Sequence, residues 1–444
     1  MLATGMTRIE GRLRALNLKP GALVCVALAS PIRHLIVAAA LFRLGHAVIS
    51  PDEAATVVPL KLPIELYLQD AGQTLIVGVR QLVVGEDWFA GGAPPDLSAP
   101  VSGFPGVDAL CCVEITSGST GRPKAICSTL GEFNQRLASQ SLICNLGDSD
   151  RLLALARLCA PWGFRLAAQT LAAGKTLVFA ESARAALQMA SVYAVETIVA
   201  STQQARDLVA QQKLSPYPLP SLRSIVFGGG LPSRALLTQI RAYLCEQAFV
   251  QYGASEVGQI AIGTADNAME IEGATGFALP GVEIEIVDAS HRPLTANTDG
   301  VVRVRTAWRS RPYPLGASHP GFHDGWFYPG DAGRLTPEGL LILSGRVSEV
   351  INSGGAKRAP EAIEDVVAQH PNVADVAAFG AMGPDGIEEI HLAVVARAAM
   401  SQQHLIDWCG ERGIEAARVF FVDSLPRTPV GKIRREDLKR QHTG

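Results

Sequence analysis

Residues 116–124 read Thr-Ser-Gly-Ser-Thr-Gly-Arg-Pro-Lys, and six of these nine residues are Gly, Ser or Thr. An apolar run, Ala109–Ile115, precedes the stretch, and a shorter one, Ala125–Cys127, follows it. The pattern predicts a strand, a loop and a second strand. A loop of this composition offers closely spaced backbone N–H groups, several hydroxyls and one ammonium, a set of donors that suits a polyphosphate.

Two common phosphate-binding motifs are excluded by spacing. The loop lacks G-x-x-x-x-G-K-[ST], so it is not a Walker A motif, and it lacks G-x-G-x-x-G, so it is not a dinucleotide fingerprint. A solvated surface turn has the same composition. The choice between a phosphate site and a plain turn therefore depends on the rest of the chain.

Composition limits the class of protein. The chain has 444 residues, of which 48% are hydrophobic and 18% charged, which is enough for two or three globular domains. The net charge of -3 does not indicate the basic surface with which proteins bind nucleic acid or an anionic membrane. The eight cysteines form no C-x-x-C motif, and together with the absence of a signal-peptide pattern and of a membrane span they favour a reducing, cytoplasmic setting.

Apolar runs alternate with helical patterns from Ala22 to about Gly253. This alternation predicts an α/β fold with doubly wound, mostly parallel sheets. Ala183–Val192 and Ser233–Leu244 are two of the expected helices, with Ser233 as an N-cap behind Pro232. Many of the chemistry-bearing residues should then gather at the carboxyl edge of such a sheet.

The pattern changes after about Gly273. Short strand patterns without helices predict a small antiparallel, β-barrel-like subdomain at about 273–345. The last hundred residues read as a compact α+β unit, with a helix that begins at Pro360 and another capped by Ser401. We expect a large N-terminal domain at 1–345 and a small C-terminal domain at 346–444.

Four further stretches carry candidate chemistry. Gly228-Gly229-Gly230 and Tyr252-Gly253-Ala254-Ser255-Glu256 each follow a predicted strand. The other two are Tyr328-Pro329-Gly330-Asp331, with Gly345-Arg346 after it, and the near-C-terminal stretch from Pro426 to Lys432. Each could be a turn or a solvated segment when taken alone. Jointly, and in this order, the stretches argue against that interpretation.

Together these motifs resemble the adenylate-forming superfamily of acyl- and aryl-CoA synthetases, peptide-synthetase adenylation domains and firefly-type luciferases. The resemblance extends from about Gly21 to the C-terminus. It implies that a carboxylate attacks the α-phosphate of ATP, that pyrophosphate leaves, and that a thiol then displaces AMP from the acyl-adenylate. It also implies Mg²⁺ and coenzyme A as cofactors and a small carboxylic acid as substrate.

The resemblance assigns roles to residues of this chain. Lys432, Glu256 and Lys124 would be catalytic, and Glu256 would hold Mg²⁺. Tyr252 would stack on adenine, while Asp331 and Arg346 would contact the ribose. The full set expected to bind nucleotide or coenzyme A is Thr116, Ser117, Gly118, Ser119, Thr120, Gly121, Lys124, Gly228, Gly229, Gly230, Tyr252, Gly253, Ser255, Asp331, Arg346, Lys432, Gly354 and Gly355.

Three features depart from the family pattern. Ser348 stands at the expected hinge, where Asp or Lys is usual. Trp162 and Phe164 follow Ala160 where many relatives place a His or another aromatic, so we expect both to line the substrate pocket. The segment before the phosphate loop is short, and an exposed sheet edge there would allow a homodimer.

The sequence thus predicts an ATP-dependent acid–thiol ligase with coenzyme A as acceptor. The alternatives are transfer to the phosphopantetheine arm of a separate carrier protein, and a degenerate nucleotide-binding protein without turnover. Few cationic residues fall in the expected pocket, which favours an apolar or aromatic acid. Nucleic acid and membrane partners are not expected.

Overall fold

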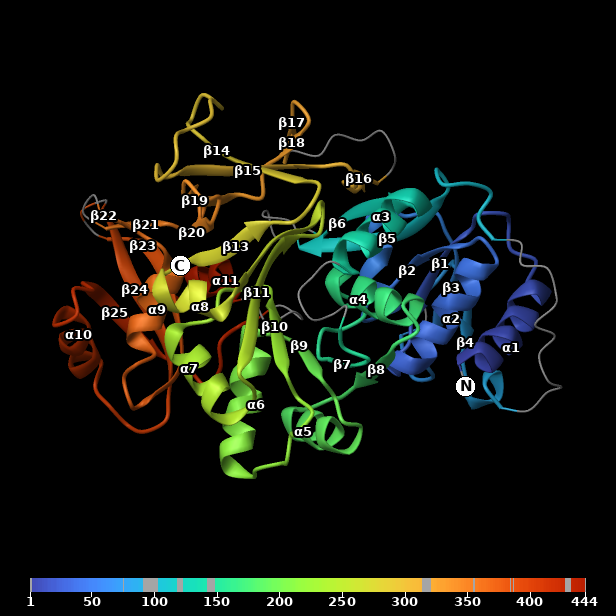
Figure 1. The fold of residues 1–444 in the computed structure, drawn as a ribbon, viewed down its shortest axis with the longest axis horizontal. Coiled ribbons are helices and arrows are strands. Elements are labelled where there is room, and N and C mark those ends of the chain that lie inside the picture. Colours follow the sequence, from blue (N-terminus) through green and yellow to red (C-terminus); the bar gives the residue numbers. More distant parts are fainter. Residues whose placement is uncertain are drawn as a thin grey trace.

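The computed structural model describes residues 2–74, 76–90, 103–117, 123–141, 148–313, 321–353, 356–383, 385, 387–427 and 433–443. Figure 1 shows the chain running from a blue sheet through a second, green-to-yellow sheet to a red C-terminal unit. No helix in these ranges is long and apolar enough to cross a membrane.

The first sheet has seven strands in the order β16-β6-β5-β2-β1-β3-β4. Its strands are β1 Leu23–Ala27, β2 Ala47–Ile49, β3 Ile64–Gln69, β4 Gln81–Val83, β5 Leu110–Ser117, β6 Pro123–Thr129 and β16 Arg311–Pro312. The five strands from β4 to β5 run parallel, whereas β6 is antiparallel to β5. The chain therefore turns back on itself between Ser117 and Pro123, as the strand–loop–strand pattern predicted.

The second sheet joins parallel and antiparallel strands in one surface. Its order is β17-β18-β15-β19-β20-β13-β12-β11-β10-β9-β7-β8, with β14 paired to β15. The strands are β7 Arg151–Ala154, β8 Thr176–Phe179, β9 Thr197–Ser201, β10 Ser224–Gly228, β11 Gln247–Ala254, β12 Gly258–Thr264, β13 Ala274–Ala278, β14 Val282–Val287, β15 Gly300–Thr306, β17 Phe322–His323, β18 Trp326–Phe327, β19 Asp331–Leu335 and β20 Leu341–Arg346.

The antiparallel strands expected after Gly273 are present, but they extend the second sheet. Strand β13 pairs with β12 on one side and with β20 on the other, so hydrogen bonds run without a break from the parallel part into the antiparallel part. The periodicity of each strand is visible in the sequence. The pairing of β12 with β13, in contrast, depends on long-range contacts and cannot be predicted from periodicity.

Helices cover both sheets. They are α1 Leu2–Ala15, α2 Pro31–Arg43, α3 Leu130–Ser141, α4 Pro161–Ala172, α5 Ala183–Val192, α6 Thr202–Leu214, α7 Arg234–Tyr243 and α8 Ala265–Glu270, with 3-10 turns η1 Ala54–Leu60 and η2 Glu86–Trp88. The expected N-cap at Ser233 is confirmed, since its side chain accepts a hydrogen bond from the Leu236 N–H.

Helix α4 lies between the two sheets, as Figure 1 shows. Phe164 and Ala167 belong to the hydrophobic cluster of the first sheet, whereas Trp162 and Leu166 pack on that of the second. Positions 162 and 166 are four apart and share a helix face, while 164 lies on the opposite face. Helix α4 thus packs against both hydrophobic cores. The position of each residue along the helical turn determines which of the two sheets its side chain contacts.

The C-terminal unit is built on a three-stranded sheet in the order β23-β24-β25. Its elements are β21 Ile351–Ser353, β22 Ala356–Arg358, α9 Pro360–Val367, β23 Val373–Met382, β24 Glu388–Ala396, α10 Gln402–Gly410, β25 Ala416–Phe421 and α11 Arg435–Thr443. Pro360 occupies the first turn of α9, and Ser401 caps α10 by accepting from the His404 N–H, both as predicted.

Candidate active site

The described ends of the predicted phosphate loop lie on β5 and β6. Thr116 lies opposite Lys124 and Ser117 lies opposite Pro123 in the register of the two strands. The side chain of Lys124 is partly buried. Gly118, Ser119, Thr120 and Gly121 lie outside the described residues, so their expected contacts with phosphate stay predictions.

Helix α3 follows the hairpin directly and begins with a reciprocal cap. The Glu132 side chain accepts from the Thr129 N–H at 2.9 Å, and the Thr129 hydroxyl accepts from the Glu132 N–H at 3.3 Å. Glu132 also pairs with Arg311 of β16 at 2.8 Å. This cap fixes the direction in which α3 leaves the hairpin.

Tyr252, Asp331 and Arg346 form one cluster. The Tyr252 hydroxyl donates a hydrogen bond to Asp331 Oδ2, and Arg346 Nε lies 2.9 Å from Asp331 Oδ1. Arg346 also donates to the Pro329 carbonyl at 2.5 Å. The structure therefore brings together three residues that the sequence separates by 79 and 15 positions.

The register of two strands explains this cluster. Asp331 begins β19 and lies directly opposite Arg346, the last residue of β20. Asp331 is only 7% exposed. Burial, followed by the charge of Asp331, raises the pKa of Tyr252 well above its ordinary value, so the phenol stays protonated and donates to the carboxylate.

Gly228, the last residue of β10, lies beside Trp162. An alanine Cβ at Gly228 would be 2.5 Å from Cη2 of Trp162 and 2.8 Å from both Cζ2 and Cζ3. Gly229 has a φ of 83°, which favours glycine, and Gly230 is exposed. The Trp162 ring therefore rests on backbone at the carboxyl end of β10, where open α/β sheets bind ligands.

Phe164 has a different environment from Trp162. It is 5% exposed and makes edge-to-face contact with Phe42, with ring centroids 6.1 Å apart. Phe133 and His34 surround the same ring. The expected role of Phe164 in the substrate pocket stays a prediction, and its packing suits support of α4 rather than contact with an acid.

The turn after β11 carries Ser255 and Glu256. The carbonyl of Glu256 accepts from the Ser310 N–H at 2.6 Å, and Ser310 stands just before β16, which pairs with β6. The Glu256 side chain is partly buried. This bridge brings the turn to the strand that bears Lys124, so two predicted catalytic residues lie in connected segments.

A buried charge cluster next to this bridge escaped the sequence reasoning. Arg136 of α3, Arg165 of α4 and Glu114 of β5 are 1%, 4% and 7% exposed. Arg165 donates to both oxygens of Glu114 at 2.8 and 2.7 Å. Burial, with the charge of Arg165 as the next cause, lowers the pKa of Arg136 to about 10, so Arg136 stays charged at neutral pH. The one visible signal was a lone Glu inside the apolar run Ala109–Ile115.

The remaining predicted residues divide into two groups. Lys432, Gly354 and Gly355 lie outside the described residues. Gly253 is exposed at the end of β11, and Ser348 is exposed in the turn between β20 and β21. Within the described part of the chain no group of three His, Cys, Asp or Glu side chains could hold a metal ion by itself.

Comparison with known proteins identifies the family. The model of the AMP-binding enzyme family matches residues 2–313, and that of the AMP-binding enzyme C-terminal domain matches residues 362–432. The chain is 29% identical to the 2-succinylbenzoate–CoA ligase of Bacillus velezensis over 346 residues, which are 76% of this chain and 70% of that protein. It is 30% identical to the fatty acid–[acyl-carrier-protein] ligase ScoC of Streptomyces coeruleorubidus, over 74% of this chain and 67% of that protein.

The fold agrees with a solved structure of the same kind. The o-succinylbenzoate CoA synthetase MenE of Bacillus subtilis, in complex with the acyl-adenylate intermediate OSB-AMP, superposes with a TM-score of 0.86 at 25% identity, over 99% of this chain and 92% of that one. The fold, the two family matches and the gathered motifs have one explanation: the chain belongs to the AMP-binding enzyme family, the AMP-forming ligases of which these relatives are members.

Proposed function

We propose that this chain joins a small carboxylic acid to coenzyme A in two steps, through an acyl-adenylate formed from ATP. The observation that carries the proposal is the Tyr252–Asp331–Arg346 cluster, because it sets a buried carboxylate, a phenol and a guanidinium at the edge of the sheet that holds Gly228. The relatives named above supply the second argument, since two of the three are CoA ligases.

The residues present fit a nucleotide. A carboxylate accepts hydrogen bonds from ribose hydroxyls, and Asp331 is held in place by the Tyr252 hydroxyl and by Arg346. At Gly229 no atom lies within 4 Å of the position that a Cβ would take, which leaves room for a flat ring, whereas the space beside Gly228 is occupied by Trp162. Tyr252 would hold the adenine by stacking and Asp331 would accept from the ribose.

The residues also fit Mg²⁺. Magnesium sites of this type use one or two carboxylates together with the phosphates of the substrate, so a single Glu256 suffices. When bound, the ion would neutralise charge that grows on the phosphates. Thr116, Ser117 and Lys124 of the hairpin would position the phosphates, and Lys432 would bridge the acid and the α-phosphate.

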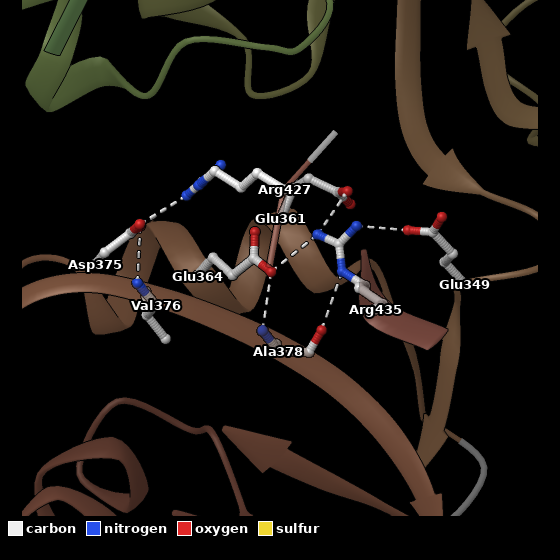
Figure 2. A network of polar contacts seen from close by, with 8 residues as sticks. All are labelled: Glu349, Glu361, Glu364, Asp375, Val376, Ala378, Arg427 and Arg435. Carbon is white, nitrogen blue, oxygen red and sulfur yellow. Dashed lines mark hydrogen bonds and ion pairs between the residues drawn. The ribbon is translucent and has the colours of Figure 1, made fainter. Parts of the chain in front are cut away.

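Ser348 is proposed as the hinge between the two half-reactions. The Val347 N–H donates to the Gly330 carbonyl at 2.9 Å, which ties Val347 to the N-terminal domain. The next residue but one, Glu349, pairs with Arg435 of α11 at 2.5 Å, as Figure 2 shows. Ser348 lies between these two attachments, in a turn that the Glu349 and Val350 N–H groups close by donating to the Arg346 carbonyl at 3.0 Å. A rotation at Ser348 would open this turn, move the C-terminal domain and bring Gly354 and Gly355 to the thiol.

The acid is proposed to be aromatic with a hydrogen-bonding substituent. Trp162 and Phe249 give the pocket face an aromatic lining. Gln251 and Gln259 share this face of β11 and β12, are 7% and 5% exposed, and their Oε1 atoms have no hydrogen-bond partner among the described residues. Buried carboxamides without partners cost stability, so a hydroxyl or a similar group on the acid would satisfy them.

Pyrophosphate release tests the proposal. Purified protein with Mg-ATP is assayed against benzoate, hydroxybenzoates, phenylacetate and short and long fatty acids, with and without coenzyme A. Turnover that needs both an aromatic acid and coenzyme A supports the proposal. Turnover only with a phosphopantetheinylated carrier protein would favour the alternative that ScoC exemplifies, and ATP binding without release for any acid would favour a degenerate nucleotide-binding protein.

The location and the oligomeric state of the enzyme are also proposals. We propose that the enzyme works in the cytoplasm, where ATP and coenzyme A are available, and that it forms a homodimer. Light scattering on the purified protein measures the second, and a monomer mass at micromolar concentration would exclude it.

A further inference from the structure

Arg136 makes contacts that its place in the sequence does not suggest. It is the largest side chain among those that are less than 2% exposed. Its Nε donates to the Trp308 carbonyl at 2.8 Å, Nη1 to the Ser255 carbonyl at 3.1 Å, and Nη2 to the Glu256 carbonyl at 2.7 Å. One guanidinium therefore binds two segments that lie more than one hundred residues away in sequence.

The charge of Arg136 is compensated by the buried carboxylate of Glu114. Glu114 Oε2 lies 3.9 Å from Arg136 Nη1, and Glu114 stands on β5 two residues before Thr116. Arg136 itself belongs to α3, which the Thr129–Glu132 cap fixes to the end of β6. The guanidinium thus connects both strands of the phosphate-loop hairpin to the turn that carries Glu256.

Only arginine can make this connection. Its planar fork presents five N–H donors, enough for three carbonyls and a carboxylate, whereas a lysine ammonium has three donors at one point. A fully buried cation is costly, so a residue that served packing alone would be better replaced by an apolar side chain. Two of its three carbonyl contacts go to the Ser255–Glu256 turn, which indicates that placement of the turn is its task.

We propose that Arg136 is a positioning residue that sets the Ser255–Glu256 turn, and with it the Glu256 carboxylate, against the phosphate-loop hairpin. The proposal rests on the proposed function of Glu256 in holding Mg²⁺. In this role Arg136 acts through the turn rather than by direct contact with nucleotide or metal. A carboxylate that must meet a metal has little tolerance for displacement, so a loosened turn weakens the response to Mg²⁺.

The structure offers a matched control. Arg165 is also buried and pairs with the same Glu114, but among the described residues its side chain makes no hydrogen bond to the carbonyls of Ser255 or Glu256. A purely structural role for the charge cluster would make Arg136→Lys and Arg165→Lys equivalent. A positioning role predicts that the Arg136 variant changes the response to Mg²⁺ more than the Arg165 variant does.

The experiment measures pyrophosphate release as a function of Mg²⁺ at saturating ATP and acid, together with the melting temperature of each variant. We expect Arg136→Lys to raise the Mg²⁺ concentration for half-maximal rate at least tenfold, with the KM for the acid within twofold of wild type. Arg165→Lys should change the Mg²⁺ response less than twofold. If Arg136→Lys does not fold, Arg136→Gln, which keeps two donors without a buried charge, takes its place.

Two results would overturn the inference. One is a folded Arg136 variant with the wild-type Mg²⁺ response, and the other is an equal shift in the Arg165 variant. Failure of the proposed function is distinguishable, because the wild type would then release no pyrophosphate with any acid. In that case the Mg²⁺ dependence of ATP binding, measured by calorimetry, supplies the same comparison between the variants.

Discussion

Replacement of Gly228 by alanine tests whether Trp162 shapes the acid pocket. The new Cβ would lie 2.5 Å from the ring, whereas carbon atoms in contact are about 3.5 to 4.0 Å apart, so the ring must retreat by about 1 Å. The ring also packs against the cluster that contains Leu166 and Phe249, which leaves little room. Overpacking of this kind costs about 1–3 kcal/mol.

We expect this displacement of the ring to weaken binding of the acid. If the ring moves toward the open end of the strands, it enters the space that we assign to the acid. At 1.4 kcal/mol per factor of ten, the expected loss in kcat/KM for the best acid is about 10- to 100-fold. The KM for ATP should change less, because Asp331 and Arg346 lie on other strands. The assay is acid-dependent pyrophosphate release, with the melting temperature measured alongside.

A second substitution isolates the contact. Leucine at position 162 lacks the three ring atoms that the new Cβ would meet, so Gly228→Ala should cost little in the Trp162→Leu background. The double-mutant cycle should therefore show a coupling of about 1 kcal/mol or more. Equal losses for Gly228→Ala in both backgrounds would refute the reasoning, since the ring would then not transmit the effect.

Three further substitutions test other parts of the molecule. Lys432→Ala should lower the adenylation rate at least about 100-fold while ATP binding, measured by calorimetry, changes less than about fivefold; normal turnover would refute the assigned role. Asp331→Asn should raise the KM for ATP about tenfold or more, because a neutral amide accepts hydrogen bonds less strongly, and an unchanged KM would argue against ribose contact. Burial raises the pKa of Glu364 from 4.5 to about 7, so the folded state takes up a proton and this group's contribution to stability falls as the pH rises from about 4.5 to 7. Arg435 pairs with Glu364 at 2.8 Å (Figure 2), and Arg435→Met should destabilise the C-terminal domain by about 3 kcal/mol or more at pH 8.5 and by clearly less at pH 6. Urea unfolding at the two pH values measures this, and a loss independent of pH would contradict it.

Several local features could be predicted because they depend on neighbours in sequence. The strand–loop–strand around residues 116–124 follows from composition and apolar runs. The caps at Ser233 and Ser401 follow from a hydroxyl placed before a helical pattern, since the hydroxyl accepts from an N–H three residues on. The order of the motifs was sufficient to indicate the family.

Trp162 and Phe164 were both expected from the sequence to line the substrate pocket. Residues two apart on a helix face in nearly opposite directions. The structure places Trp162 against Gly228 and Phe164 against Phe42. The shared role of the two residues in the pocket stays a prediction.

The sequence by itself determined the family, the residue types at the site and many of the helices and strands. Only the tertiary structure decided which of them meet. Tyr252 reaches Asp331, and Arg136 reaches Glu256, across 79 and 120 positions of sequence. Such contacts depend on strand register and on the pairing of β12 with β13, and a register shift of one residue would send every side chain to the other face. Burial has the same origin: nothing local to Arg136 indicates that its charge lies in the interior, because burial is a property of everything that packs around it.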